Sequence, residues 1–226
     1  GPGHPVLDRP ARVGPLQLGE DPDPGVGREA RHVDDRRLAD RVFDLAWTHN
    51  QVVMRQLNAT EADAQLYGRL ANSILYANSS LRADPGDLVK NRRGQSGLWG
   101  YAISGDLPIV LLQIGDRANI DLVRELVQAY AYWRFKGLAV DLVIWNEDHA
   151  GYRQLLHEQI MGLIAAGLEA HVIDRPGGIF VRPSDQISTE DRILLQSVAR
   201  AIITDRRGSL ADQITRRGHR EVTVPR

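Results

Sequence analysis

Two short segments of the chain carry side chains whose types and spacing could support catalysis or ligand binding. The first is Asn146-Glu147-Asp148-His149, where two carboxylates and an imidazole follow a run of apolar residues. Such carboxylates can serve as general acid or base, or can accept hydrogen bonds from sugar hydroxyls. The alternative is a solvated loop in which Asp148 caps the next helix, because helix N-termini favour such residues. Asn146 and Glu147 are therefore candidate substrate-binding residues.

The second segment is residues 91–105, which combines glycines with arginine and aromatic side chains. Its backbone amides, together with Arg93, could hold an anion, although the segment has neither a Walker pattern nor Gly-x-Gly-x-x-Gly. Trp99 and Tyr101 offer flat faces for stacking on sugar rings, and the carboxylate of Asp106 lies close in the sequence. The alternative is a tight connection whose glycines adopt unusual backbone angles. These four side chains complete the set of candidate substrate-binding residues.

Composition excludes several classes of site and ligand. The 226 residues contain no cysteine, so disulfides and thiolate chemistry are excluded. A net charge of -1 provides no basic field for nucleic acid. No apolar stretch approaches the roughly 20 residues that span a bilayer, so we expect no direct membrane insertion of this segment. No pair of histidines has the spacing of a zinc motif, and we expect neither a metal nor a cofactor.

The elements that must position these side chains follow from hydrophobic periodicity. Apolar runs at 109–114 and 139–145 are typical of strands buried on both faces of a parallel sheet. Helical periods alternate with such runs, as expected of right-handed crossovers. The remaining predicted elements are helices at 120–135 and 152–166, short strands at 170–173 and 179–181, and a last helix from Ser188 that ends near Gly208. The pattern predicts a small three-layer α/β unit with a mostly parallel sheet, preceded by an antiparallel helical pair.

Changes in composition along the chain predict its domain organisation. The predicted parts are an irregular or flexible leader at 1–34, a helical linker pair at 35–86, a glycine-rich connection at 87–107, an α/β domain at 108–207 and a polar C-terminal tail at 208–226. Ligands of open α/β sheets bind beyond the C-terminal ends of the strands. We expect three loops at that edge, beginning at Gly115, Asn146 and Asp174.

A resemblance to a known family appears in four stretches of sequence. Residues 94–112, 136–147 and 208–213, together with Ala46-Trp47-Thr48-His49, resemble the cyclic β-1,2-glucan synthase family of bacteria. The family's members are very large inner-membrane enzymes that build β-1,2-glucan from UDP-glucose and carry a glycoside-phosphorylase-like catalytic barrel. The resemblance implies that this chain is an internal segment between β-sandwich regions, upstream of that barrel and in the cytosol. No catalytic motif of the family lies within it.

Three functions remain open at this point. The resemblance favours a non-catalytic structural or interdomain module, inactive alone, whose partners are the flanking domains and whose candidate ligand is β-1,2-glucan. That hypothesis predicts exposed apolar surface on the helices of residues 35–78. The second is an active carbohydrate phosphorylase or transferase module at the C-terminal edge of the sheet, with Glu147 and a partner such as Asp116 as its acids. The third is a stand-alone nucleotide-binding α/β protein.

Overall fold

A computed structural model of the chain describes residues 24–148, 153–167 and 170–215. The chain forms two compact units, Gly1–His49 and Asn50–Arg226, and each is described by itself. Helix α1 runs over Pro24–Gln56 and passes from the first unit into the second. It therefore begins within the segment that was predicted to be an irregular leader. The last proline of that segment is the first residue of the helix, where a missing N–H costs no hydrogen bond. Residues 1–23 lie outside the described residues.

The second unit is built on a four-stranded sheet whose strands all run parallel. The strands are β1 (Ile109–Ile114), β2 (Asp141–Asn146), β3 (Ile179–Pro183) and β4 (Ala201–Thr204). Their order across the sheet is β3-β2-β1-β4. The register pairs Gln113 with Trp145 of β2 and with Thr204 of β4. The predicted α/β class with a parallel sheet is confirmed.

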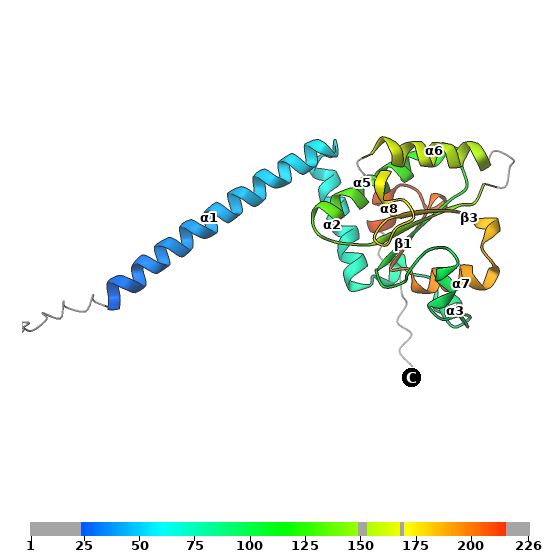
Figure 1. Ribbon diagram of the computed structural model, residues 1–226, viewed down its shortest axis with the longest axis horizontal. Helices are drawn as coiled ribbons and strands as arrows, with labels where there is room; N and C mark the ends of the chain where they lie inside the picture. Colours follow the sequence, from blue (N-terminus) through cyan, green and yellow to red (C-terminus); the bar gives the residue numbers. More distant parts are fainter. Residues whose placement is uncertain (1–23, 149–152, 168–169, 216–226) are drawn as a thin grey trace, which may run out of the picture. The chain divides into compact units, whose positions relative to one another are not determined.

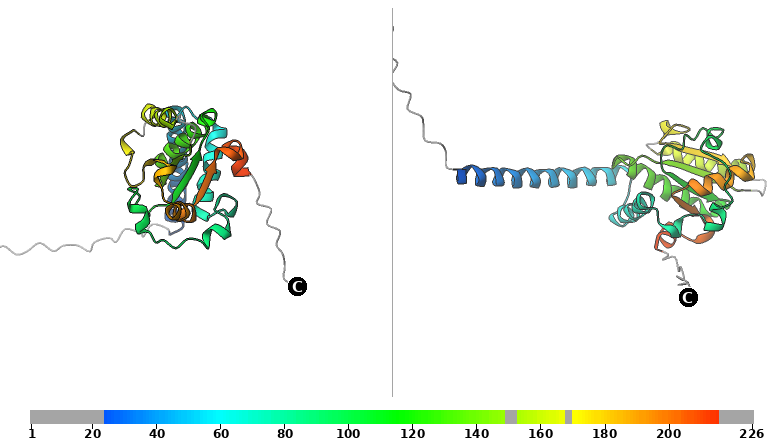
Figure 2. Two further views of the ribbon diagram at one scale, coloured as in Figure 1. Left: turned by 90° about the vertical axis from the view of Figure 1, so that its right-hand side faces the viewer. Right: turned by 90° about the horizontal axis from the view of Figure 1, so that it is seen from below.

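Helices cover both faces of this sheet, as Figure 1 and Figure 2 show. One face carries α5 (Ile120–Phe135) and α6 (Arg153–Ala166), with α2 (Glu61–Tyr76) and α8 (Leu210–Thr215) packed on α5. The other face carries α7 (Thr189–Val198), which contacts the short helices α3 (Pro85–Leu88) and α4 (Ser96–Trp99). Five 3-10 turns complete the described elements: η1 (Ser79–Leu81), η2 (Arg117–Asn119), η3 (Ala170–Val172), η4 (Ser184–Gln186) and η5 (Asp205–Arg207).

The alternation of side chains along β1 divides the core into two layers. Val110, Leu112 and Ile114 pack in the cluster beneath α5 and α6, whereas Ile109 and Leu111 pack in the cluster beneath α7. Successive residues of a strand point to opposite faces, so a strand that is buried on both sides needs apolar residues throughout. This is why the continuous apolar runs in the sequence located β1 and β2 correctly.

Two predicted elements in the C-terminal half of the chain are wrong. The last helix was expected to reach the region of Gly208, but α7 ends at Val198 and strand β4 follows it. The chain turns extended at Ala199, with ψ 129°, and the next apolar residues pair with β1 instead of continuing the helix. The strand predicted at 170–173 is the 3-10 turn η3, followed by one isolated bridge from Ile173 to Ile179.

Because residues 170–173 do not form a strand, the loop predicted from Asp174 lies at the N-terminal edge of the sheet and not at the C-terminal edge. Residues 174–178 lead into the N-terminal end of β3 and do not follow a strand of the sheet. The buried carboxylate of Asp141, at the start of β2, accepts a hydrogen bond from the N–H of Gly177 at 2.7 Å. Burial raises the pKa of Asp141, and the nearby Asp106 raises it further. The hydroxyl of Tyr130 donates to the carbonyl of Gly177.

Candidate functional site

The topology of the sheet identifies one place where a ligand would be expected. The chain moves outward from β1 to β2 and β3 through α5 and α6, and then returns through α7 to place β4 on the other side of β1. The order of strands therefore reverses between β1 and β4. In open α/β sheets, ligands bind in the crevice beyond the C-terminal ends of the strands at such a reversal.

The backbone N–H groups at this crevice are hydrogen-bonded to the carboxylate of Asp205. Oδ2 of Asp205, in the turn after β4, accepts hydrogen bonds from the N–H of Gly115 at 2.8 Å and of Asp116 at 2.9 Å. Successive backbone amides that converge on one oxygen are a common way of holding an anion. An external phosphate or carboxylate would have to displace Asp205 from these two donors.

The loop after β2 is likewise tied to its neighbours. Asn146 is buried, and its Oδ1 accepts a hydrogen bond from the N–H of Asp148 at 3.0 Å. The carboxylate of Glu147 forms an ion pair with Arg206 at 3.1 Å. The proposed second acid, Asp116, accepts through Oδ1 from the N–H of Ala118 at 2.8 Å. These side chains thus hold the loops of the C-terminal edge together. Residues 149–152, including His149, lie outside the described residues.

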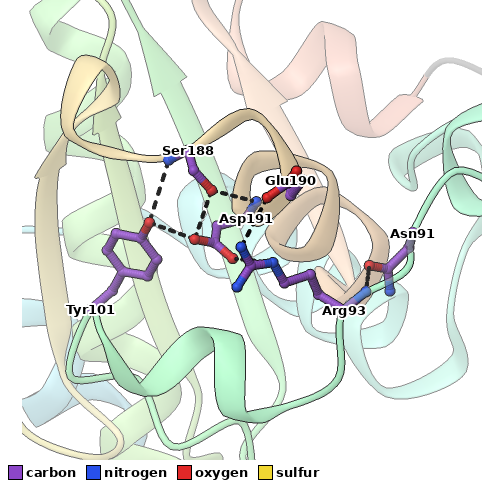
Figure 3. Close-up of polar contacts among 6 residues, drawn as sticks. All are labelled: Asn91, Arg93, Tyr101, Ser188, Glu190 and Asp191. Carbon is purple, nitrogen blue, oxygen red and sulfur yellow. Dashed lines mark hydrogen bonds and ion pairs between the residues drawn. The ribbon is translucent and has the colours of Figure 1, made fainter.

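The second group of candidates lies on the α7 face, where Asp191 joins the glycine-rich segment to the helix (Figure 3). Its Oδ2 accepts hydrogen bonds from the hydroxyls of Tyr101 at 2.9 Å and Ser188 at 2.8 Å. Nε of Arg93 lies 3.4 Å from Oδ1 of Asp191, and the same guanidinium pairs with Glu190 at 2.8 Å. Burial, and then the hydrogen bond to Asp191, raise the pKa of Tyr101. Arg93 and Tyr101 therefore fasten this segment to the start of α7.

Trp99 and Asp106 lie within the fold of the same segment. The indole N–H of Trp99 donates to the carbonyl of Ser104 at 3.3 Å, while 63% of the residue remains exposed. Gln95 donates through Nε2 to the carboxylate of Asp106 at 3.0 Å. A Cβ added to Gly97 would lie 2.7 Å from a methyl carbon of Leu194, so any larger residue at this position would force Leu194 to shift.

The six candidates therefore form two separate groups. Asp106 precedes the N-terminal end of β1, whereas Asn146 and Glu147 stand at the C-terminal end of β2. A strand as long as β1 spans about 17 Å between its first and last residue, so Asp106 lies at the opposite edge of the sheet from Asn146 and Glu147. The carbonyl of Tyr101, in contrast, accepts a hydrogen bond from Arg182 of β3 at 2.7 Å. Sequence reasoning missed Asp191 and Asp205 as the carboxylates that organise each group. Ser188 and Asp191 were recognised only as the start of a helix.

The described part of the chain offers no alternative metal centre or membrane span. No group of three or more histidine, aspartate or glutamate residues among residues 24–148, 153–167 and 170–215 is placed to hold a metal ion. No helix within those ranges is both long and apolar enough to cross a bilayer.

Comparison with known proteins supports a relationship over most of the chain. No family model matches the sequence. The cyclic beta-(1,2)-glucan synthase NdvB of Rhizobium meliloti (strain 1021) is 34% identical to it over 172 residues, which is 76% of this chain. The matched part is 6% of the length of that protein, so the chain corresponds to a small segment of its relative. The resemblance that the sequence indicated is confirmed.

Proposed function

This chain belongs to the cyclic β-1,2-glucan synthase family, and from that premise we propose that it is a non-catalytic α/β module. Its role is to hold the neighbouring sugar-processing modules of such an enzyme in place. As parts of the same proposal, its partners are the flanking modules, and it lies on the cytosolic side of an enzyme anchored in the inner membrane. The reaction itself is assigned to other parts of the enzyme.

The observation that carries this proposal is the position of Asp205. A catalytic or nucleotide site at the reversal of strand order would need the amides of Gly115 and Asp116 for its ligand, and both donate to Asp205 instead. Glu147, the candidate acid, is engaged by Arg206. Polar groups whose hydrogen bonds and ion pairs are already formed within the protein fit a rigid scaffold better than a reaction centre.

Exposed apolar side chains on α1 support the role in holding other modules. Trp47 is 67% exposed and Phe43 is 72% exposed, although both are large enough to contribute strongly when buried. The structural hypothesis predicts such surface on the helices of residues 35–78, because contiguous exposed apolar groups mark interaction sites. Over residues 35–56, where the side chains of α1 are described, the exposed large apolar residues are Leu38, Val42, Phe43, Leu45, Trp47 and Val52.

The test is a direct assay of the chain for the reactions of a glucan-processing enzyme. It would be incubated with UDP-glucose, and separately with linear β-1,2-glucan and inorganic phosphate, beside a full-length cyclic β-1,2-glucan synthase as positive control. We expect no release of UDP and no formation of glucose 1-phosphate. Turnover that is lost in a Glu147→Gln variant would overturn the proposal and place an active site at the C-terminal edge of the sheet.

A further inference from the structure

Gln113 is an anomaly in the central strand of the sheet. The other five residues of β1 are apolar and buried, whereas Gln113 is partly exposed. It lies in alternation with Ile109 and Leu111, so its side chain points to the face covered by α7. Among the described residues its amide has no hydrogen-bond partner. A polar group that the fold does not use, in a strand that favours apolar residues, suggests a role toward a ligand.

The amide of Gln113 lines a groove on this face of the sheet. The groove has a volume of about 640 Å³ and lies between η1 and α3 on one side and α7 and β4 on the other. Volumes of this size are typical of small-molecule sites. Gln113 and Arg207 flank the reversal of strand order, so the groove opens beside the crevice that Asp205 closes. The predicted sugar-binding residues Trp99, Tyr101 and Glu147 are not among its lining residues.

The lining of this groove is rich in donors and acceptors that the protein leaves unused. Gln196 on α7 contributes a second amide without a partner in the described chain, and Arg207 forms no ion pair there. Arg82 donates through one terminal nitrogen to the carbonyl of Ser197 at 2.7 Å. Its Nε is buried without a hydrogen-bond partner. These groups converge from η5, α7, the segment after η1 and the central strand.

The charges around the groove determine the kind of ligand that fits. The lining mixes the guanidinium groups of Arg82 and Arg207 with the carboxylates of Asp84 and Asp87, and Asp87 also pairs with Lys90 at 2.8 Å beside the groove. An anion such as a phosphate would meet the carboxylates as well as the arginines. A neutral ligand with many hydroxyl groups can donate to carboxylates, accept from guanidinium groups and do both with the amides.

We propose that this groove binds a neutral saccharide, with Gln113 and Gln196 as the residues that orient it. A short glucan is the saccharide that the relative's name suggests. The inference goes beyond the proposed positioning role and does not depend on it. A scaffold that also holds a sugar chain would keep the product of a neighbouring module close to the next one.

The test is isothermal titration calorimetry of the chain with a short linear β-1,2-gluco-oligosaccharide, with glucose 1-phosphate and with inorganic phosphate. The informative variant is Gln113→Leu, because leucine fits a strand that is otherwise apolar and should leave the unfolding temperature unchanged or higher. Gln196→Leu removes the second amide. Trp99→Ala is the matched control, since its exposed indole is the competing sugar platform and lies outside the groove.

We expect the oligosaccharide to bind to the unmodified chain and to Trp99→Ala alike, with the dissociation constant at least tenfold higher in Gln113→Leu. We expect neither anion to bind more tightly than the sugar. Absence of binding in the unmodified chain, binding unaffected by Gln113→Leu, or preference for an anion would each overturn the inference. None of these results alters the outcome of the turnover assay, so the two proposals fail independently.

Discussion

Replacing Asp205 by alanine tests whether its carboxylate holds the loops at the reversal of strand order. The substitution removes one oxygen that accepts from two backbone amides, those of Gly115 and Asp116. It leaves Arg206 and its ion pair with Glu147 in place. The strands themselves should be unaffected, because Asp205 follows the last residue of β4.

The expected loss follows from the exposure of the two donors. A hydrogen bond to a charged group contributes about 1.5–3 kcal/mol when water cannot replace it. The amide of Asp116 belongs to an exposed residue, so water can replace most of its bond, whereas Gly115 is partly buried. We therefore expect Asp205→Ala to lower the free energy of unfolding by about 2 kcal/mol, which urea unfolding can resolve.

Asp205→Asn is the matched control for the charge. Its amide oxygen can still accept from both N–H groups, so it should recover about half of the loss or more, because it retains neutral hydrogen bonds. A second readout is the response to phosphate. The two amides freed in Asp205→Ala form an anion-binding concavity, so phosphate should raise the unfolding midpoint of this variant more than that of the unmodified chain. Equal stability of all three proteins, with equal responses to phosphate, would refute this account of the crevice.

Three further substitutions probe other parts of the fold by urea or thermal unfolding of the chain. Asp191→Ala removes the carboxylate that accepts from the hydroxyls of Tyr101 and Ser188, and should cost about 2–4 kcal/mol. A loss below about 0.5 kcal/mol would show that these hydrogen bonds add little. Gly97→Ala places a carbon 2.7 Å from Leu194 and should cost about 1–3 kcal/mol through overpacking, and an unchanged midpoint would contradict the close approach. Burial raises the pKa of Asp141 in the folded state. Asp141 therefore contributes most to stability below the ordinary aspartate pKa, and this contribution is lost as pH rises through the pKa of the folded state. The unmodified chain should therefore lose stability relative to Asp141→Asn as pH rises above about 4, the ordinary aspartate pKa, and a difference that does not change with pH would count against a buried titrating carboxylate.

Much of the fold could be predicted because buried parallel strands and amphipathic helices leave clear patterns. Strand β1 and helix α5 begin and end at the predicted residues. Strand β4 was missed because it has four residues and its apolar positions continue the spacing of the helix before it. Its strand character depends on pairing with β1, which lies about 90 residues earlier and leaves no local signal.

The candidate sites were harder to predict for the same reason. The capping pattern of Ser188 and Asp191 is local and was recognised, but the contacts of Asp191 with Arg93 and Tyr101 come from a distant segment. The bonds of Asp205 to the amides of Gly115 and Asp116 join residues 90 and 89 positions apart. Gln113 carried a signal that was available in the sequence, since it interrupts an otherwise apolar strand.

The most direct measurement of the central claim is the rate of glucan synthesis by an enzyme that contains this segment. A chimeric cyclic β-1,2-glucan synthase would carry the chain in place of its matched segment, with and without Glu147→Gln and Asp205→Asn. If the segment only positions its neighbours, turnover per folded enzyme should stay within about twofold in both variants. A catalytic acid or base contributes about 10²–10⁴-fold. A loss of that size, with expression and unfolding temperature unchanged, would contradict the account.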